Sequence, residues 1–287
     1  APVITSPAGT TVVSRLWQTV SGTGAVYAAE VRFYINSACV ATSTPAVNGT
    51  FSATLDLQTG TNRITAAAVN RAGVGTTSSP VTVVSDQSVP AAPIGVVAAA
   101  QADGVIRVSW SDPLGVNIKG YNIYRASSPF TATAQAARVN TSLVATKVYS
   151  DLPATDGPYY YRVSAVNLAD TEGPLSAEAS ATNDRVAPKV LVVAYSTDGV
   201  SVPAENRYGR GNLTIDLTVS EALQTTPFFS LNPVSGTPIS PALTKLSDTS
   251  YRGTFAVTEA SPCGTAYATF SGRDAVGNRG TEIQSGG

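Results

Sequence analysis

The chain has 287 residues, with 18 basic and 19 acidic side chains and a formal net charge of −1. This balance, without any basic run, argues against a nucleic-acid-binding protein, which needs many cations to neutralise phosphates, and no apolar run approaches the roughly 20 residues of a membrane-spanning helix. Histidine is absent, which excludes a Ser-His-Asp triad and removes the commonest general base and zinc ligand.

Two proline-containing breaks, at residues 85–90 and 183–188, divide the chain into three stretches of similar length. Each stretch has about the 100 residues of one immunoglobulin-like β-sandwich. Frequent valine, threonine, glycine and proline favour strands and turns, and no long segment has helical apolar spacing. We therefore predict an all-β chain of three tandem antiparallel β-sandwiches, with domains at residues 1–86, 90–184 and 188–287.

In the first stretch, apolar and polar residues alternate at Val31, Phe33 and Ile35 and again from residue 51 to 57. Alternation with a period of two places one face of a strand in a core and the other in solvent. Asn48 and Gly49 form a two-residue hairpin signal before the second run. The pattern predicts a small antiparallel sandwich.

The sequence of this stretch, including VRFYIN at 31–36 and GTFSATLDLQTGTNRITAAAVNRAGVG at 49–75, resembles the Ig-like modules repeated in large bacterial surface proteins. The resemblance covers most of residues 1–86. It implies that the segment before Asn70 is the penultimate strand and that residues 70–75 form the turn into the last one. These motifs specify a fold well and a ligand poorly.

The second stretch resembles a fibronectin type III domain over residues 90–184, through PIGVVAAAQADGVIRVSWSDP at 93–113, IKGYNIYRA at 118–126 and YYYRVSAVN at 159–167. The resemblance implies that Trp110 is the core tryptophan. It also implies that Tyr159 is a corner tyrosine, whose hydroxyl bonds to the backbone at the end of the sheet. Tyr161 and Leu152 complete the set of structural residues expected here.

Tyrosines of the second stretch offer an alternative, functional interpretation. A row of exposed aromatic rings would bind sugars by stacking, and the candidates are Tyr124, Tyr149 and Tyr160. The competing interpretation is that these rings pack in the core or along a sheet edge.

The third stretch alternates again, and GRDAVGNRG at 272–280 resembles the turn before the last strand of bacterial Ig-like repeats. Only residues 281–287 follow that turn, so we expect this sandwich to lack most of its last strand. An unpaired neighbour in a sheet is a liability. Two explanations are open: the sequence is a fragment of a longer chain, or the N-terminal strand of a second copy completes the sheet.

The two cysteines, Cys39 and Cys263, fall in different predicted domains. They are either unrelated free thiols or the two halves of a disulfide between copies, because an odd cysteine in an extracellular domain suggests intermolecular pairing. A head-to-tail contact of this kind does not close and therefore builds a fibre.

Carboxylates near the breaks are weak calcium candidates. The residues are Asp86, Asp184 and Asp274, with Asn183 and Asn278 beside them. Calcium takes six to eight oxygen ligands, and no dense run of aspartates supplies them here. The alternative is that these side chains cap turns.

The absence of histidine and of nucleophile motifs predicts that the chain is not an enzyme. The favoured function is structural: an extracellular or cell-surface spacer, or a fibre element that binds itself head-to-tail or binds neighbouring modules. The alternative is an adhesin or a carbohydrate-binding accessory module that recognises surface glycans. No cofactor other than the weak calcium candidate is expected, and no partner nucleic acid.

Overall fold

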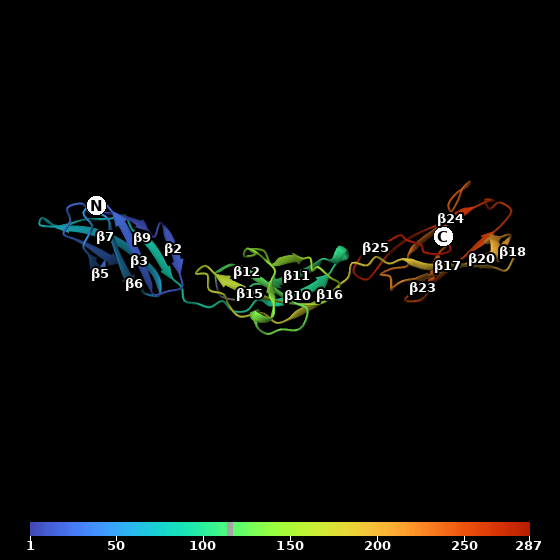
Figure 1. Cartoon of the computed structure of the whole chain (residues 1–287), viewed down its shortest axis with the longest axis horizontal. Helices are drawn as coiled ribbons and strands as arrows, with labels where there is room; N and C mark the ends of the chain where they lie inside the picture. Colours follow the sequence, from blue (N-terminus) through green and yellow to red (C-terminus); the bar gives the residue numbers. More distant parts are fainter. Residues whose placement is uncertain (114–116) are drawn as a thin grey trace. The chain divides into compact units, whose positions relative to one another are not determined.

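The computed structural model describes residues 1–113 and 117–287 (Figure 1). Strands dominate it, and the described helices are short 3-10 turns: η1 (Ala102–Gly104), η2 (Thr133–Gln135) and η3 (Pro203–Glu205). The all-β class predicted from the sequence is confirmed. Within the described residues, no helix is long and apolar enough to cross a membrane.

The first stretch forms two sheets. Its strands are β1 (Val3–Ser6), β2 (Thr10–Val13), β3 (Trp17–Thr23), β4 (Glu30–Ile35), β5 (Ala38–Ser43), β6 (Phe51–Asp56), β7 (Gly60–Asn70), β8 (Gly73–Thr77) and β9 (Val81–Ser85). One sheet has the order β1-β3-β6, and the other has the order β2-β9-β7-β4-β5 with β8 on β7. All pairs are antiparallel except β2 with β9.

The core of the first stretch follows the predicted alternation. Val31, Phe33 and Ile35 of β4 are buried, and the residues between them are half-buried. Phe33 meets Phe51 edge to face, with ring centroids 5.7 Å apart, an arrangement that aromatic pairs favour. The sequence therefore predicted correctly which face of β4 is buried.

The second stretch also forms two sheets. Its strands are β10 (Ile94–Ala100), β11 (Ile106–Ser111), β12 (Ile118–Ala126), β13 (Ala137–Arg138), β14 (Val148–Asp151), β15 (Gly157–Asn167) and β16 (Ala179–Asn183). The sheet orders are β10-β11-β14 and β13-β12-β15-β16. Asn167, the last residue of β15, is buried and donates from Nδ2 to the carbonyl of Ser88, 2.8 Å away. This hydrogen bond attaches the segment just before Pro90 to the end of β15.

The third stretch has two main sheets and a small ribbon. Its strands are β17 (Val190–Thr197), β18 (Ser201–Val202), β19 (Arg207–Tyr208), β20 (Gly211–Val219), β21 (Phe228–Pro233), β22 (Leu243–Ser247), β23 (Ser250–Val257), β24 (Ala266–Arg273) and β25 (Arg279–Gly280). The main sheets have the orders β17-β20-β23-β22 and β21-β24-β25, and β18 pairs with β19. Ile215, Leu217, Phe229 and Tyr251 fill the core.

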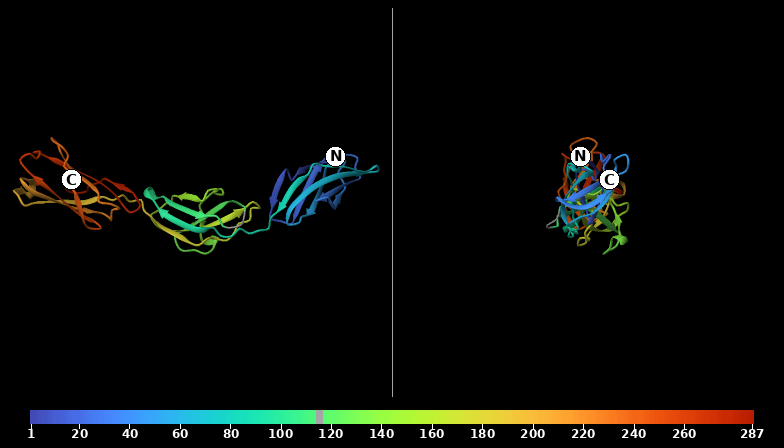
Figure 2. Two further views of the ribbon diagram at one scale, coloured as in Figure 1. Left: turned by 180° about the vertical axis from the view of Figure 1, so that it is seen from behind. Right: turned by 90° about the vertical axis from the view of Figure 1, so that its left-hand side faces the viewer.

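Each sheet takes all its strands from one of the three stretches, and the strands of each stretch gather together in the left view of Figure 2. Proximity of Cα atoms groups the chain differently, into two compact units. One unit comprises residues 1–97, 109–149 and 160–179, and the other comprises residues 98–108, 150–159 and 180–287. The domain limits at 86, 90, 184 and 188 therefore stay a prediction.

Candidate functional sites

Strand β24 has one fully paired side and one side that is largely open. Along residues 266–271 it pairs with β21, whereas β25 reaches only Gly272 and Arg273 on the other side. Among residues 1–113 and 117–287, no strand pairs with that second side at 266–271. We call residues 266–271 of β24 the open edge.

The hydrogen-bond register shows which backbone groups face outward there. Residues of an antiparallel pair alternate between exchanging hydrogen bonds with one neighbour and facing away from it. Asp274 donates its N–H to the carbonyl of Asn278 on the β25 side, whereas Thr265 accepts from Val234 on the β21 side. Even-numbered residues of β24 therefore point to the β25 side. The N–H and C=O groups of Ala266, Ala268 and Phe270 accordingly face the open edge.

The expectation that the third sandwich lacks most of its last strand stays a prediction, and no strand is assigned among residues 281–287. Residues 281–287 do follow β25, but they leave β24 and join the other sheet. Val190 donates its N–H to Glu282 and accepts from Gln284, at 2.9 and 2.8 Å, in a parallel bridge centred on Ile283. Ser285 accepts from Val193 at 2.9 Å. These residues thus form an isolated bridge beside β17 and not a strand.

A cleft of about 720 Å³ lies between the open edge and this C-terminal segment. Its lining residues are Ala268, Thr269, Phe270, Thr281, Ile283, Gln284, Ser285, Gly286 and Gly287. In the first stretch, the corresponding side of β7 pairs with β9 over five residues, 60–64 with 81–85. The cleft therefore lies where a strand lies in the first stretch.

Cys39 lies on β5, and Cys263 lies in the segment before β24. Both residues are exposed, and both thiols are free. Their exposure suits a bond between copies, which stays a prediction.

The structure brings two of the three calcium candidates together. Asp184, Asp274 and Glu221 place carboxylate oxygens within 4.8 Å of one another, and Asp86 is not in this group. Burial and the charges of the two aspartates raise the pKa of Glu221. Carboxylate oxygens are the ligands that a hard cation such as calcium takes, so this group stays the calcium candidate. Glu221 was missed, because nothing in the sequence shows that the second residue after β20 lies beside the second break.

The same side chains also serve turns, as the alternative interpretation expected. Asp274 is 1% exposed, and its Oδ1 accepts from the N–H groups of Val276, Gly277 and Asn278. Asp86 and Asp184 each accept from the N–H two residues later. Stabilisation of turns therefore explains the aspartates without an ion.

The side-chain amides of Asn278 and Asn183 both form hydrogen bonds with backbone groups, and Asn278 also binds the carboxylate of Asp274. Asn278 is buried and donates from Nδ2 to Asp274 Oδ2 and to the carbonyl of Asp184, while its Oδ1 accepts from the N–H of Asp103. Asn183 donates to the carbonyl of Thr155 at 2.9 Å. These amides thus tie the segment before the second break to its neighbours.

Three of the four structural residues expected in the second stretch are packed or bonded. Trp110 is 5% exposed and meets Tyr121 edge to face at 5.2 Å, and Tyr161 is fully buried. Tyr159 is half-buried, and its hydroxyl donates to the carbonyl of Thr155, four residues upstream. This bond is the one that a corner tyrosine makes.

Leu152 was assigned to the core wrongly. It is 63% exposed. The reason is the alternation at the end of β14: Asp151 and Pro153 point inward, so the residue between them points to solvent.

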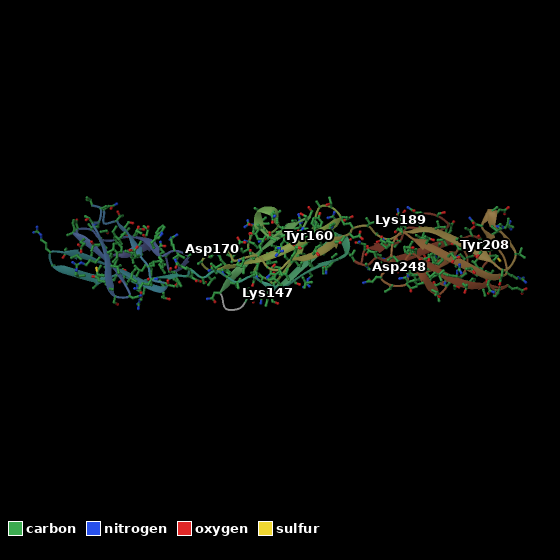
Figure 3. All side chains as sticks on the ribbon, turned by 90° about the horizontal axis from the view of Figure 1, so that it is seen from below. Lys147, Tyr160, Asp170, Lys189, Tyr208 and Asp248 are labelled. Atoms are coloured by element: carbon green, nitrogen blue, oxygen red, sulfur yellow. The ribbon has the colours of Figure 1, made fainter. Side chains whose placement is uncertain are left out.

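The tyrosines proposed to stack on sugars are not a row of exposed rings. Tyr124 is 8% exposed and donates to Glu172 Oε1; burial, followed by this bond, raises its pKa to about 12. Tyr149 donates to the carbonyl of Val139. Tyr149 and Tyr160, the latter labelled in Figure 3, are half-buried. For Tyr124 the sugar interpretation is wrong, because the ring faces are covered.

Glu172 is the centre of a polar network over the sheet β13-β12-β15-β16. Its Oε1 accepts from Asn122, Tyr124 and Ser164. Burial raises the pKa of this carboxyl, but the three hydrogen bonds outweigh burial and lower it overall. The network has a structural role in covering this face of the sheet.

Comparison with known proteins finds solved structures of low similarity. No family model and no curated protein matches the chain. Fibronectin(III)-like modules of CbhA from Clostridium thermocellum are 14% identical over 64% of this chain and 95% of theirs, with a TM-score of 0.43. An Fn3-like protein from the same organism is 29% identical over 32% of this chain and 92% of its own, with a TM-score of 0.28.

The FN1–FN3 domains of chicken CNTN1 are 13% identical over 99% of this chain and 98% of theirs, with a TM-score of 0.40. All these TM-scores are below 0.5. The likenesses therefore carry no conclusion about what this chain binds.

Proposed function

We propose that this chain is a structural module of an extracellular protein, and that it joins a second copy head-to-tail by strand addition. The open edge of β24 is the observation that carries the proposal. Strand addition to an exposed sheet edge takes its affinity from main-chain hydrogen bonds. A contact between two different surfaces of identical chains does not close, so it extends into a filament.

The open edge has none of the usual features that prevent pairing. Natural sheets protect their edges with charged residues, prolines or bulges. Residues 266–271 read Ala-Tyr-Ala-Thr-Phe-Ser, without a charge or a proline. Two core-facing side chains, Ala268 and Ile283, line the adjacent cleft. An added strand would therefore gain both backbone bonds and apolar contact.

Strand β1 of a second copy is the proposed occupant. It is the terminal strand of the sheet β1-β3-β6, so one of its sides faces no strand in that sheet. Its sequence Val-Ile-Thr-Ser also lacks charge, and Val3 is 57% exposed. Two uncharged edges can pair without either strand leaving its own sheet, although β1 is irregular between Ile4 and Ser6 and lies between Pro2 and Pro7.

Substitution of Ala268 tests this proposal. Proline in Ala268→Pro removes an N–H that faces the open edge, while the hydrogen bonds to β21 involve the odd-numbered residues. Ala268→Ser is the matched control, because it keeps the N–H. Thr269→Lys places a charge beside the edge through an exposed side chain and serves as a second variant.

We expect sedimentation velocity to show concentration-dependent association of the wild-type chain and of Ala268→Ser, and electron microscopy to show filaments. Ala268→Pro and Thr269→Lys should remain monomeric with unchanged circular dichroism. A wild-type chain that stays monomeric at its highest soluble concentration would overturn the proposal. So would filaments that both blocking variants still form.

A further inference from the structure

The turn between β3 and β4 presents Tyr27 in an unusual way. Ala28 donates its N–H to the carbonyl of Ala25, which closes a turn over Val26 and Tyr27. Tyr27 has a φ of 65°, and this turn position favours glycine or asparagine. The tyrosine is 96% exposed, so its ring contributes almost nothing to the core.

Stability therefore does not explain this residue. A bulky side chain at positive φ costs free energy, and burial does not offset that cost here. The turn is nevertheless firmly held: Ala25 donates to the carbonyl of Gly49, and Ala29 donates to that of Val69, at 3.0 and 2.8 Å. A rigid turn that displays a solvated aromatic ring is typical of a binding surface.

A cleft of about 520 Å³ lies beside the ring. It is lined by Tyr27, Ala28, Ala29, Asn70, Arg71 and Ala72. Asn70 accepts from the N–H of Ala72 through Oδ1, and its Nδ2 has no partner among the described residues. Arg71 is exposed and forms no ion pair within residues 1–113 and 117–287. Two residues with hydrogen-bond donors, Asn70 and Arg71, thus line the same cleft as Tyr27.

The charge of this end of the sandwich narrows the ligand class. The segments 24–30, 45–50 and 70–75 contain two charged residues, Glu30 and Arg71, and Glu30 is paired with Arg32 at 2.7 Å. Backbone bonds join the first segment to the other two, because Gly49 and Val69 accept from it. The planar guanidinium binds carboxylates through two parallel N–H groups.

We propose that the cleft of Tyr27 and Arg71 binds an acidic sugar, with the pyranose ring stacked on Tyr27 and the sugar carboxylate on Arg71. Asn70 Nδ2 would donate to a ring hydroxyl. This site differs from the sugar-stacking tyrosines expected in the second stretch, and it does not depend on strand addition at β24. The sequence concealed it, because Tyr27 lies in no alternating run.

Isothermal titration calorimetry of the full chain tests the site, with a galacturonate oligomer and a neutral glucose oligomer of equal length as probes. The variants are Tyr27→Gly and Arg71→Gln. The control is Phe228→Ala, which removes another largely exposed aromatic side chain (55%). Tyr27→Gly should also fold at least as well as the wild type, because glycine accepts positive φ readily.

We expect the acidic oligomer to bind the wild type and Phe228→Ala alike. Tyr27→Gly should weaken binding at least about tenfold, a difference of roughly 1.4 kcal/mol, and Arg71→Gln should abolish the preference over the neutral oligomer. No binding of the acidic oligomer, or binding that Tyr27→Gly leaves unchanged, would overturn the site. Equal binding of both oligomers by the wild type would overturn its acidic character.

Discussion

Single side chains stabilise the second stretch in two different ways. Trp110 fills volume, with 5% of its surface exposed and its ring against Tyr121. Glu172 instead satisfies polar groups, because Asn122 and Ser164 are buried donors that reach it. Removing the first leaves a cavity, and removing the second leaves donors without an acceptor.

Trp110→Ala should lower the free energy of unfolding by about 3–5 kcal/mol, as expected for loss of a buried aromatic side chain. Trp110→Phe should cost much less, because Nε1 of the tryptophan has no hydrogen-bond partner among the described residues. Scanning calorimetry would measure both variants. Equal costs for the two substitutions would show that the indole nitrogen has a partner after all.

Glu172→Ala should destabilise the chain by about 1–2 kcal/mol, because buried donors lose their acceptor and water replaces it only in part. The lowered pKa of Glu172 also predicts a pH effect. An acid whose pKa is lower in the folded state stabilises above its unfolded pKa, near 4.3, and that stabilisation disappears as pH falls through the folded pKa. Urea titrations from neutral pH downward should show a smaller acid dependence for Glu172→Gln than for the wild type.

Glu221 has the opposite shift, since burial and two nearby aspartates raise its pKa. A raised pKa means that the ionised carboxylate destabilises the folded chain at neutral pH. Glu221→Gln should therefore raise the melting temperature in buffer with a chelator. If the three carboxylates hold calcium, added calcium should stabilise the wild type and have little effect on Glu221→Gln. An identical response of both proteins would leave turn stabilisation as the role of Asp184 and Asp274.

At the scale of elements, the sequence predicted which face of a strand is buried better than it predicted which strands pair. The alternation around Phe33 identified the buried side of β4, because that pattern is local. It did not predict the parallel pairing of β2 with β9 or the passage of residues 281–287 from one sheet to the other. Pairing depends on residues far apart in the chain, and a period of two is the same for any neighbour.

The candidate sites were predicted only in part, for the same reason. Asp184 lies at the second break and Asp274 in the turn at 272–280, but their meeting with Glu221 needs the tertiary fold. Leu152 was misplaced by one step of the alternation, and Tyr124 was taken for a solvent-facing ring. Local patterns find turns and strands; they do not show what covers a residue.

The crossing of the C-terminal segment requires Gly280. A Cβ at this position would lie 1.5 Å from the carbonyl oxygen of Pro188. Gly280→Ala should therefore cost about 1–3 kcal/mol or more, as overpacking does. Gly209→Ala is a control in the same stretch, because its Cβ would approach Val200 O only to 3.1 Å. Chemical denaturation would contradict the crossing if both variants were equally stable.

At the scale of the whole molecule, the proposed assembly places exposed thiols on every copy. Cys39 and Cys263 are both free and exposed. In a head-to-tail filament each copy presents one thiol toward each neighbour, if the predicted pairing is right. Covalent linkage would then follow assembly rather than cause it.

Non-reducing electrophoresis of oxidised filaments should give a ladder of multimers. Cys39→Ser and Cys263→Ser should each abolish the ladder while filaments still form. A ladder that persists in either single variant would show that like cysteines pair, and monomer bands from oxidised wild-type filaments would remove the disulfide.

The unprotected side of β24 also has a consequence for how such a protein is made. Nascent or partly exported polypeptides contain many extended segments, and the unpaired N–H and C=O groups of an uncharged edge strand bind such segments with little selectivity. If the chain is secreted, as proposed above, a temporary cap would have to cover this edge until the second copy binds.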